Sequence, residues 1–265
     1  MVVDANRPQC SVDADCVKRG TAFAGSVCLD GLCGADPKEV AFEKQWSCRG
    51  PAENQNPGYQ VTMHLRDAIT TKPLPGVQGQ LCAKRDVDCK DPLRQGTADT
   101  NGTLVLSVDA GFDGYVQLTD SHIAPALYFL TPPASGDLDL PTVPLATPLV
   151  ASGIAQSSGG TAWNQERGIV LLNAFDCQGA PAVGVSFSLG GVPDPSAFNF
   201  YLVDGLPTNK STVTDYTGYG GLVNVAAGAT TIAATLQPSN RKVGNISILI
   251  RAGYISYSNV TPSSL

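Results

Sequence analysis

The sequence predicts an all-β protein, with two tandem Greek-key β-sandwiches after a small disulfide-rich N-terminal module. Three observations lead to this prediction. One pattern of turns and strands occurs twice along the 265 residues, and five of the eight cysteines lie within the first 48. Short stretches of strand-like alternation are separated by Gly, Pro or Asn turns, as in β-sandwiches. We therefore expect a Cys-rich head over residues 1–50, a first sandwich over 57–150 and a second over 165–265.

The cysteines indicate a head that is held together by covalent bonds. The segment between Cys10 and Cys33 has few large apolar residues, so it needs a disulfide or metal staple to fold. Zinc is the weaker alternative, because structural zinc sites favour C-x2-C spacings, often with histidine. No C-x2-C spacing occurs in the chain, and neither of its two histidines is near this segment. An even number of cysteines in such a chain fits an oxidising compartment.

We expect all eight cysteines to form disulfide bonds, although spacing alone does not fix the connectivity. They are Cys10, Cys16, Cys28, Cys33, Cys48, Cys82, Cys89 and Cys177. Our working assignment interleaves two bonds in the head, Cys10–Cys28 and Cys16–Cys33. A local bridge, Cys82–Cys89, spans a short polar loop, and the remaining two cysteines form Cys48–Cys177.

Each copy of the repeat contains a Pro- and Gly-containing turn, a strand, an Asp–Gly turn and a second strand. In the first copy the turns and the last strand are at 73–77, 99–102 and 104–111, and in the second at 180–185, 215–218 and 222–228. Gly102 and Gly218 stand where a tight hairpin needs a positive φ. Asp99 and Asp215 can accept hydrogen bonds from the turn amides. We predict that these four residues lock the two turns, and metal ligation or acid catalysis by the aspartates is the weaker alternative.

Alternation of apolar and polar residues predicts about seven short strands per repeat, which is typical of a Greek-key sandwich. The first repeat has strand candidates at 59–65, 77–82, 103–108, 115–119, 127–130 and 142–150. The second has them at 168–175, 183–189, 212–215, 221–225, 230–236, 245–251 and 254–260. Residues 151–166 are expected to form a junction or long loop, residues 190–211 a long loop, and the best helix candidate is 37–45.

Both copies resemble the carboxypeptidase regulatory-like domain, a transthyretin-like β-sandwich. In the first copy the family pattern is carried by Asp67, Pro73, Gly76, Val77, Asp99, Gly102 and Gly111. In the second it is carried by Asp176, Gly179, Pro181, Gly184, Val185, Thr214, Asp215, Gly218 and Gly228. The first copy departs from the pattern because its Thr97 is not adjacent to Asp99. The resemblance implies accessory, adhesive or scaffold modules, and the layout of head and sandwiches is similar to secreted or surface proteins of myxobacteria-like bacteria.

Composition excludes several classes of partner. The net charge is −6 and no run of Lys or Arg reaches four, which argues against nucleic acid and against anionic membrane surfaces. No stretch approaches the roughly 20 apolar residues of a membrane span. The N-terminus has no apolar signal-peptide core. Because of the cysteines, we expect an extracellular or cell-surface protein whose export signal is absent from this sequence.

Motifs typical of catalysis or of metal binding are scarce in the sequence. The two histidines, His64 and His122, lie in no metal-binding spacing, and no G-x-S-x-G or P-loop motif occurs. The D-x-D pairs at 13–15 and 137–139 leave calcium as a weaker alternative. We therefore expect no cofactor and no metal. Paired carboxylates that meet only in space would make a hydrolase, which is the least favoured function.

The leading hypothesis is a non-catalytic structural or adhesive protein that binds partner proteins or assembles on a surface. The alternative is a carbohydrate-binding module in the region 190–219, which would bind polysaccharide through exposed rings. Its candidate residues are Phe198, Phe200, Tyr201, Tyr216 and Tyr219. These aromatics could instead fill the end of the sandwich core, in which case the alternative fails.

Overall fold

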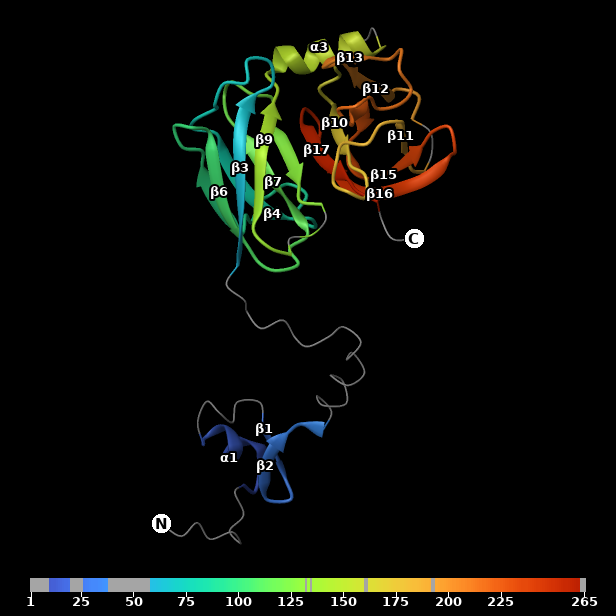
Figure 1. Cartoon of the computed structure of the whole chain (residues 1–265). Coiled ribbons are helices and arrows are strands. Elements are labelled where there is room, and N and C mark those ends of the chain that lie inside the picture. Colours follow the sequence, from blue (N-terminus) through green and yellow to red (C-terminus); the bar gives the residue numbers. More distant parts are fainter. Residues whose placement is uncertain are drawn as a thin grey trace. The chain divides into compact units, whose positions relative to one another are not determined.

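A computed structural model describes residues 10–19, 26–37, 58–131, 133, 135–159, 162–191 and 194–262. The chain divides into two compact units, Met1–Gln55 and Asn56–Leu265, which we call the head and the body. Figure 1 shows the elements of each. The helix expected at 37–45 lies almost wholly outside the described residues, as does Cys48.

The described residues of the head form one short helix and one hairpin, which two disulfides join. Helix α1 (Asp13–Val17) precedes strands β1 (Ser26–Leu29) and β2 (Leu32–Ala35), which pair antiparallel. The two turn residues, Asp30 and Gly31, both have positive φ, as tight hairpin turns require. The disulfides are the two expected here, Cys10–Cys28 and Cys16–Cys33.

The first half of the body (residues 58–145) is a sandwich of two sheets. Sheet β6-β3-β9 is built from β3 (Tyr59–Asp67), β6 (Thr103–Val108) and β9 (Leu138–Leu145). The strands β5-β4-β7-β8 form the other layer, with bounds Arg94–Thr97, Gln78–Ala83, Gly114–Thr119 and Ala126–Phe129. Along β3 every second side chain is buried, including Val61, Met63 and Leu65, which explains the alternation in the sequence.

The second half of the body (residues 162–262) repeats this arrangement. One layer contains β14 (Tyr219–Ala226), β10 (Arg167–Ala174) and β17 (Ile255–Val260), extended by the hairpin of β12 (Phe198–Val203) and β13 (Leu206–Thr208). The other layer is β11 (Val185–Leu189), β15 (Gly228–Leu236) and β16 (Arg241–Ile250). The predicted all-β class with two sandwiches and a disulfide-rich head is confirmed.

The repeat seen in the sequence is also a repeat of pairing and of hydrogen bonds. Strand β3 pairs antiparallel with β6 and parallel with β9, and β10 pairs in the same way with β14 and β17. The backbone N–H of Leu65 donates to the carbonyl of Gly102 over 2.7 Å, and that of Ala174 donates to Gly218 over 2.9 Å. Equivalent sequence positions therefore make equivalent bonds.

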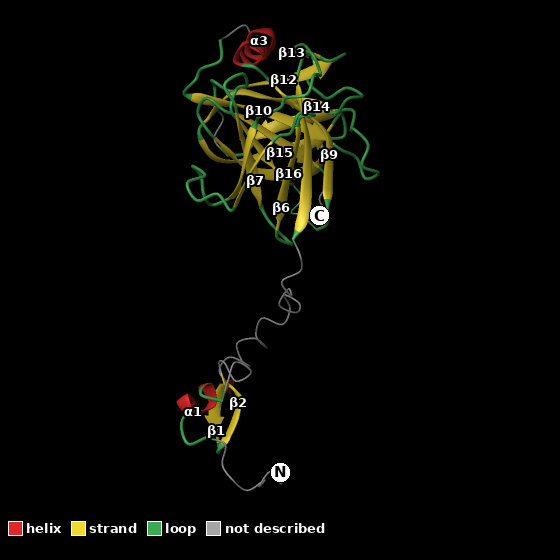
Figure 2. Ribbon diagram, turned by 90° about the vertical axis from the view of Figure 1, so that its left-hand side faces the viewer, coloured by secondary structure: helices red, strands yellow, loops and turns green. Residues whose placement is uncertain are grey.

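The two halves share one sheet. The last strand of the chain, β17, pairs parallel with β8 of the first half, which joins the layers into nine strands in the order β13-β12-β14-β10-β17-β8-β7-β4-β5. Figure 2 shows this sheet running through the body. The domain boundaries expected at 57–150 and 165–265 stay a prediction, because both halves belong to a single compact unit.

Three expectations about local structure are wrong. Residues 148–159 form helix α3 (Pro148–Gly159) where a strand end and a loop were expected. The stretch 190–211 contains the β12–β13 hairpin, and 212–215 is not a strand. The sequence does not predict helix α3, because its small and polar residues give no amphipathic stripe. Within the described residues, no helix is long and apolar enough to cross a membrane.

Candidate functional site

A cavity of about 650 Å³ lies at the end of the body that helix α3 covers (Figure 1), and both halves line it. The floor is the junction of β8 and β17, the walls come from β9, β10, β13 and β14, and α3 contributes its inner face. Its apolar lining includes Leu140, Val150, Ile154, Leu171, Phe175 and Leu206. None of the lining side chains is Asp, Glu, Lys, Arg or His.

Three tyrosines are among the polar residues of the lining. Tyr128 and Tyr257 are directly opposite each other on β8 and β17, and their rings stack with centroids 6.4 Å apart. Burial raises the pKa of Tyr128 to about 12 and that of Tyr257 well above its usual range, and Tyr219 raises both further. Burial also raises the pKa of Tyr219 itself.

The hydroxyl of Tyr219 differs from the other two. Tyr128 has a hydrogen bond with the side chain of Asn259, and Tyr257 has one with the backbone of Ala146. No described residue hydrogen-bonds to the Tyr219 hydroxyl, and burial alone shifts its pKa. The cavity therefore contains one half-buried phenol whose hydrogen-bonding capacity is unused.

The aromatic residues predicted as a binding surface do not form one. Phe200 is fully buried in one hydrophobic core of the body and Tyr201 in the other, and Phe198 packs against the core that contains Phe200. Tyr216 is 66% exposed and lies in the Asp215 turn, whereas Tyr219 faces the cavity. The reason is that this segment is not a loop: β12 pairs with β14, so its residues fill the layer between the sheets.

The Asp99 turn has the geometry of the predicted lock. One carboxylate oxygen of Asp99 accepts the backbone N–H groups of Asn101 and Thr103, each over 2.8 Å. Gly102 has a φ of 73°. A Cβ at Gly102 would lie 2.6 Å from the carbonyl oxygen of Leu65, so only glycine fits.

The Asp215 turn is built in the same way. Asp215 accepts the backbone N–H of Thr217 over 2.9 Å with one oxygen and that of Asp204 over 3.1 Å with the other. Gly218 has a φ of 73°, and a Cβ there would lie 2.6 Å from the carbonyl oxygen of Ala174. Asp99 through one oxygen and Asp215 through both therefore accept hydrogen bonds from backbone N–H groups.

Three of the four carboxylates of the D-x-D pairs also accept backbone N–H groups. Asp13 accepts the N–H of Cys28 over 2.8 Å, and Asp137 accepts that of Gln60 over 2.8 Å. Asp15 accepts the two N–H groups that precede α1. These bonds give the three carboxylates a structural role that needs no calcium.

The cysteines fall into three groups. The sulfurs of Cys10, Cys16 and Cys33 lie within 4.8 Å of one another, but all three are in disulfides, so they offer no thiolate to a metal. Cys82 and Cys89 form the expected local bridge. Cys177 is exposed and unpaired among the described residues. Its expected partner Cys48 lies outside them, so the Cys48–Cys177 bond stays a prediction.

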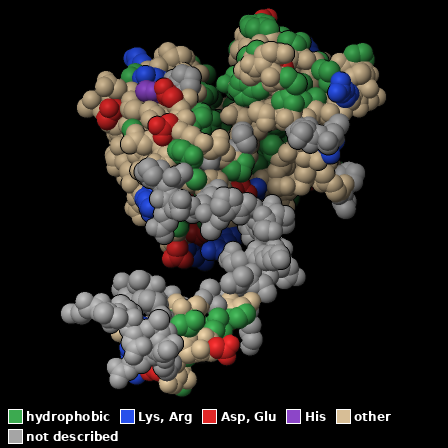
Figure 3. All heavy atoms as spheres, turned by 60° about the horizontal axis from the view of Figure 1, so that its bottom comes forward, with side chains coloured by type: hydrophobic (Ala, Val, Ile, Leu, Met, Phe, Trp, Pro, Cys, Tyr) green, Lys and Arg blue, Asp and Glu red, His purple; other side chains and the backbone are tan. Residues whose placement is uncertain are grey.

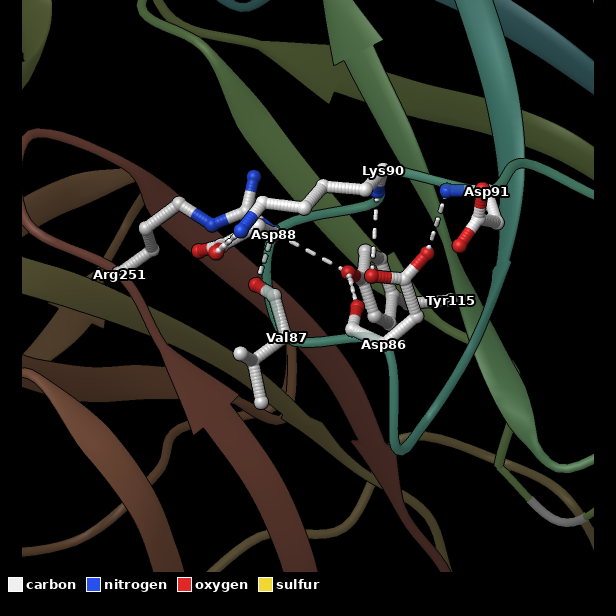
Figure 4. Close-up of polar contacts among 7 residues, drawn as sticks. All are labelled: Asp86, Val87, Asp88, Lys90, Asp91, Tyr115 and Arg251. Carbon is white, nitrogen blue, oxygen red and sulfur yellow. Dashed lines mark hydrogen bonds and ion pairs between the residues drawn. The ribbon is translucent and has the colours of Figure 1, made fainter.

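Sequence reasoning missed Arg251, which ties the two halves of the body together (Figure 4). It follows β16, and its guanidinium donates to the carbonyl of Val87 inside the disulfide loop and, over 3.1 Å, to the hydroxyl of Tyr115. It also donates to the side chain of Gln117 and stacks over Tyr254, 4.8 Å from the ring centroid.

The disulfide loop is ordered around Asp86, as Figure 4 shows. The hydroxyl of Tyr115 donates to its carbonyl, and its carboxylate accepts the N–H groups of Asp91 over 2.9 Å and Lys90 over 3.1 Å. The Asp91 and Lys90 bonds hold the pKa of Asp86 below its usual value. The loop thus presents the Val87 carbonyl to Arg251 in a fixed position.

One face of the body is mixed in charge (Figure 3). On the face drawn in Figure 3, acidic and basic side chains are interspersed and no large patch of one sign appears. This agrees with a chain in which only 15% of residues are charged. A mixed surface on a chain of net charge −6 does not attract a polyanion over a distance.

Acid is expected to weaken the body partly through Asp67, which caps the turn after β3. The N–H and hydroxyl of Thr70, and then the N–H of Ile69, hold the pKa of Asp67 below its usual value. A carboxyl whose pKa is lowered by folding stabilises the protein above its unfolded pKa, and this stability is lost as the pH falls through the folded pKa. The free energy of unfolding should therefore fall between about pH 5 and pH 2.

In chemical denaturation, the free energy of unfolding of Asp67→Asn should fall less over this pH range than that of the unaltered protein. Asp91→Asn, the same change at an exposed side chain, should behave like the unaltered protein. An equal loss in all three proteins would contradict the role given to Asp67.

No protein-family model and no curated protein matches the chain. Among solved structures, the Bacillus anthracis TIE protein is similar at 11% identity and a TM-score of 0.29, over 78% of this chain and 34% of that one. The shaft pilin SpaA of Lactobacillus rhamnosus GG is similar at 15% identity and 0.26, over 78% and 99%. The Streptococcus agalactiae minor pilin GBS52 is similar at 13% and 0.23, over 78% and 98%. These values describe a distant likeness among β-sandwich folds, from which no function follows.

Proposed function

We propose that this chain is a non-catalytic structural or adhesive protein of the cell surface or the extracellular medium, which binds a partner protein or assembles with copies of itself. The observation that carries the proposal is the fusion of two repeats into one body. A shared nine-stranded sheet and the Arg251 contacts leave little freedom for one half to move against the other. Such a body suits mechanical support or the presentation of a surface.

The disulfides support a location on the cell surface or in the extracellular medium. The described part of the chain contains three of them, and two hold together the short helix and the hairpin that are described in the head. Disulfides of this kind form and persist in oxidising environments. A head so small depends on them to fold.

The repeat supports a finer assignment. We propose that each half is a carboxypeptidase regulatory-like domain, because the residues of that pattern make matching turns in both halves. Gly76 and Gly184 both have positive φ, and their N–H groups donate to Ala98 and Thr214 over 3.0 and 2.9 Å. Modules of that family act as accessories or scaffolds, which fits a structural role.

Localisation and thiol chemistry in the source cells test the proposal together. Intact cells would be treated with a protease and with a thiol-alkylating reagent that does not cross membranes, and the released chain would be analysed by mass. We expect release from the surface, or recovery from the medium, with Cys10, Cys16, Cys28 and Cys33 labelled only after reduction. A protease-protected chain with these four thiols free would overturn the proposal.

The proposed binding to a partner protein or to copies of the chain is tested separately. Light scattering of the purified full chain would report self-association, and binding to source cells stripped of surface proteins would report a partner. Either association supports the proposal, whereas a strictly monomeric chain that neither binds stripped cells nor remains on intact ones contradicts it.

A further inference from the structure

We propose that the cavity under helix α3 binds a small, uncharged, mainly apolar molecule that carries one hydrogen-bonding group, such as a medium-chain alcohol or ester. This goes beyond the surface role and does not depend on it. The volume of about 650 Å³ is within the range of roughly 300–1,000 Å³ in which proteins bind small ligands. Most of the lining is apolar, as in such sites.

The lining selects against charge. None of its side chains is a carboxylate, a histidine or a basic group, so an ionised ligand would lose its hydration without gaining a partner of opposite charge. The raised pKa values of Tyr128 and Tyr219 mean that the phenols remain neutral at physiological pH. A fatty acid anion or an ammonium ion is therefore a poor ligand, and an uncharged molecule is a good one.

The Tyr219 hydroxyl is available to fix orientation, and among the other lining residues the buried Oδ1 of Asn173 also lacks a hydrogen-bond partner. The Tyr219 hydroxyl is half-buried in the lining and has no partner among the described residues, whereas those of Tyr128 and Tyr257 are engaged. A phenol both donates and accepts hydrogen bonds. It would bind the hydroxyl or carbonyl of the ligand, while the stacked rings below contact its apolar part.

The mouth of the cavity is apolar as well. Ile69 and Leu206 line it and are nevertheless 69% and 71% exposed, and Leu149, at the start of α3, is 82% exposed. Exposed apolar side chains around a cavity mark a place where an apolar ligand enters or leaves. An aliphatic chain longer than the cavity could extend along them.

Gly153 offers a variant that fills the cavity without distorting the fold. It lies on α3 and faces the cavity, and a Cβ built on it would meet no atom within 4 Å. Gly153→Leu therefore places a side chain in the empty space, and it replaces a poor helix former by a good one. Ser157→Leu adds the same side chain to an exposed position of the same helix and is the matched control.

The test is a titration of the full chain with the uncharged dye N-phenylnaphthylamine, followed by displacement with decanol, decanoate or decylammonium. We expect saturable dye fluorescence that decanol reverses and the two ions do not. Gly153→Leu should abolish it and Ser157→Leu should not. No saturable fluorescence, equal binding by Gly153→Leu, or displacement by the ions as effective as by decanol would each overturn the proposal.

Tyr219→Phe tests the hydrogen bond and remains informative if Gly153→Leu fails to fold, because it keeps the size of the side chain. We expect decanol to bind about fivefold more weakly to this variant, which is the usual effect of one lost hydrogen bond. Unchanged decanol affinity would remove the role assigned to the Tyr219 hydroxyl.

Discussion

Gly218→Ala is expected to lower the free energy of unfolding of the body by about 2–5 kcal/mol. Two costs add at this position. An L-residue with positive φ costs roughly 1–2 kcal/mol. The new Cβ would also lie 2.6 Å from the carbonyl oxygen of Ala174 and 3.2 Å from the amide nitrogen of Ala182, so backbone must move, at a cost of about 1–3 kcal/mol. Urea denaturation followed by circular dichroism would measure the sum.

A second glycine separates the two costs. Gly179 also has a positive φ, of 78°, but a Cβ there would meet nothing within 4 Å. Gly179→Ala should therefore lose only about 1–2 kcal/mol, the conformational cost alone. Equal losses for Gly218→Ala and Gly179→Ala would show that the close approach at the Asp215 turn does not constrain the fold.

The first half provides an independent repetition. Gly102, with a Cβ position 2.6 Å from the carbonyl oxygen of Leu65, corresponds to Gly218. Gly76 has a φ of 83° and open space around it, so it corresponds to Gly179 as a control. The same difference between the two alanine variants is expected here.

These turns were predictable because their causes are local. An Asp followed by a glycine three residues later, placed between two apolar runs, already contains the acceptor, the positive φ and the strands that need connecting. The disulfides of the head were predictable for a similar reason: a segment without a core needs a staple. Most strand positions followed from alternation, since one side of each outer strand faces a core.

The cavity was not predictable, because its parts come from strands that are distant in the sequence. Tyr128 and Tyr257 meet through the parallel pairing of β8 with β17, and no local pattern indicates which strands of two repeats will pair. One indication was present in the sequence: Ser256 and Ser258 are buried, as is Tyr257 between them. Small polar residues in a strand that is buried on both faces fit a central strand, and the alternation argument assumed an exposed face.

The aromatic segment was misjudged for a related reason. Between 190 and 211 the turn residues Asp204 and Gly205, both with positive φ, separate two short strands. An Asp-Gly pair between strand-forming residues is a hairpin signal. Given that signal, Phe200 and Tyr201 would have been assigned to the core.

Arg251→Met is expected to lower the free energy of unfolding by about 2–3 kcal/mol, the range for losing hydrogen bonds to a charged group in a partly buried site. Methionine keeps most of the aliphatic length but none of the donors, so the Val87 carbonyl and the Gln117 side chain lose a partner. Arg241→Met, at an exposed arginine of β16, should change stability by at most about 0.5 kcal/mol. Chemical denaturation of both variants gives the comparison, and equal effects would contradict an anchoring role.

A double-mutant cycle distinguishes anchoring between the halves from a local effect. Arg251 comes from the second half and Tyr115 from the first, and they are joined by a hydrogen bond of 3.1 Å and by the ring contact at 5.9 Å. If they act together, Arg251→Met and Tyr115→Phe combined should cost about 1 kcal/mol less than the sum of the single variants. Additive losses would mean that Arg251 stabilises only its own half. In that case the shared sheet alone, through β8 and β17, would hold the two repeats as one body.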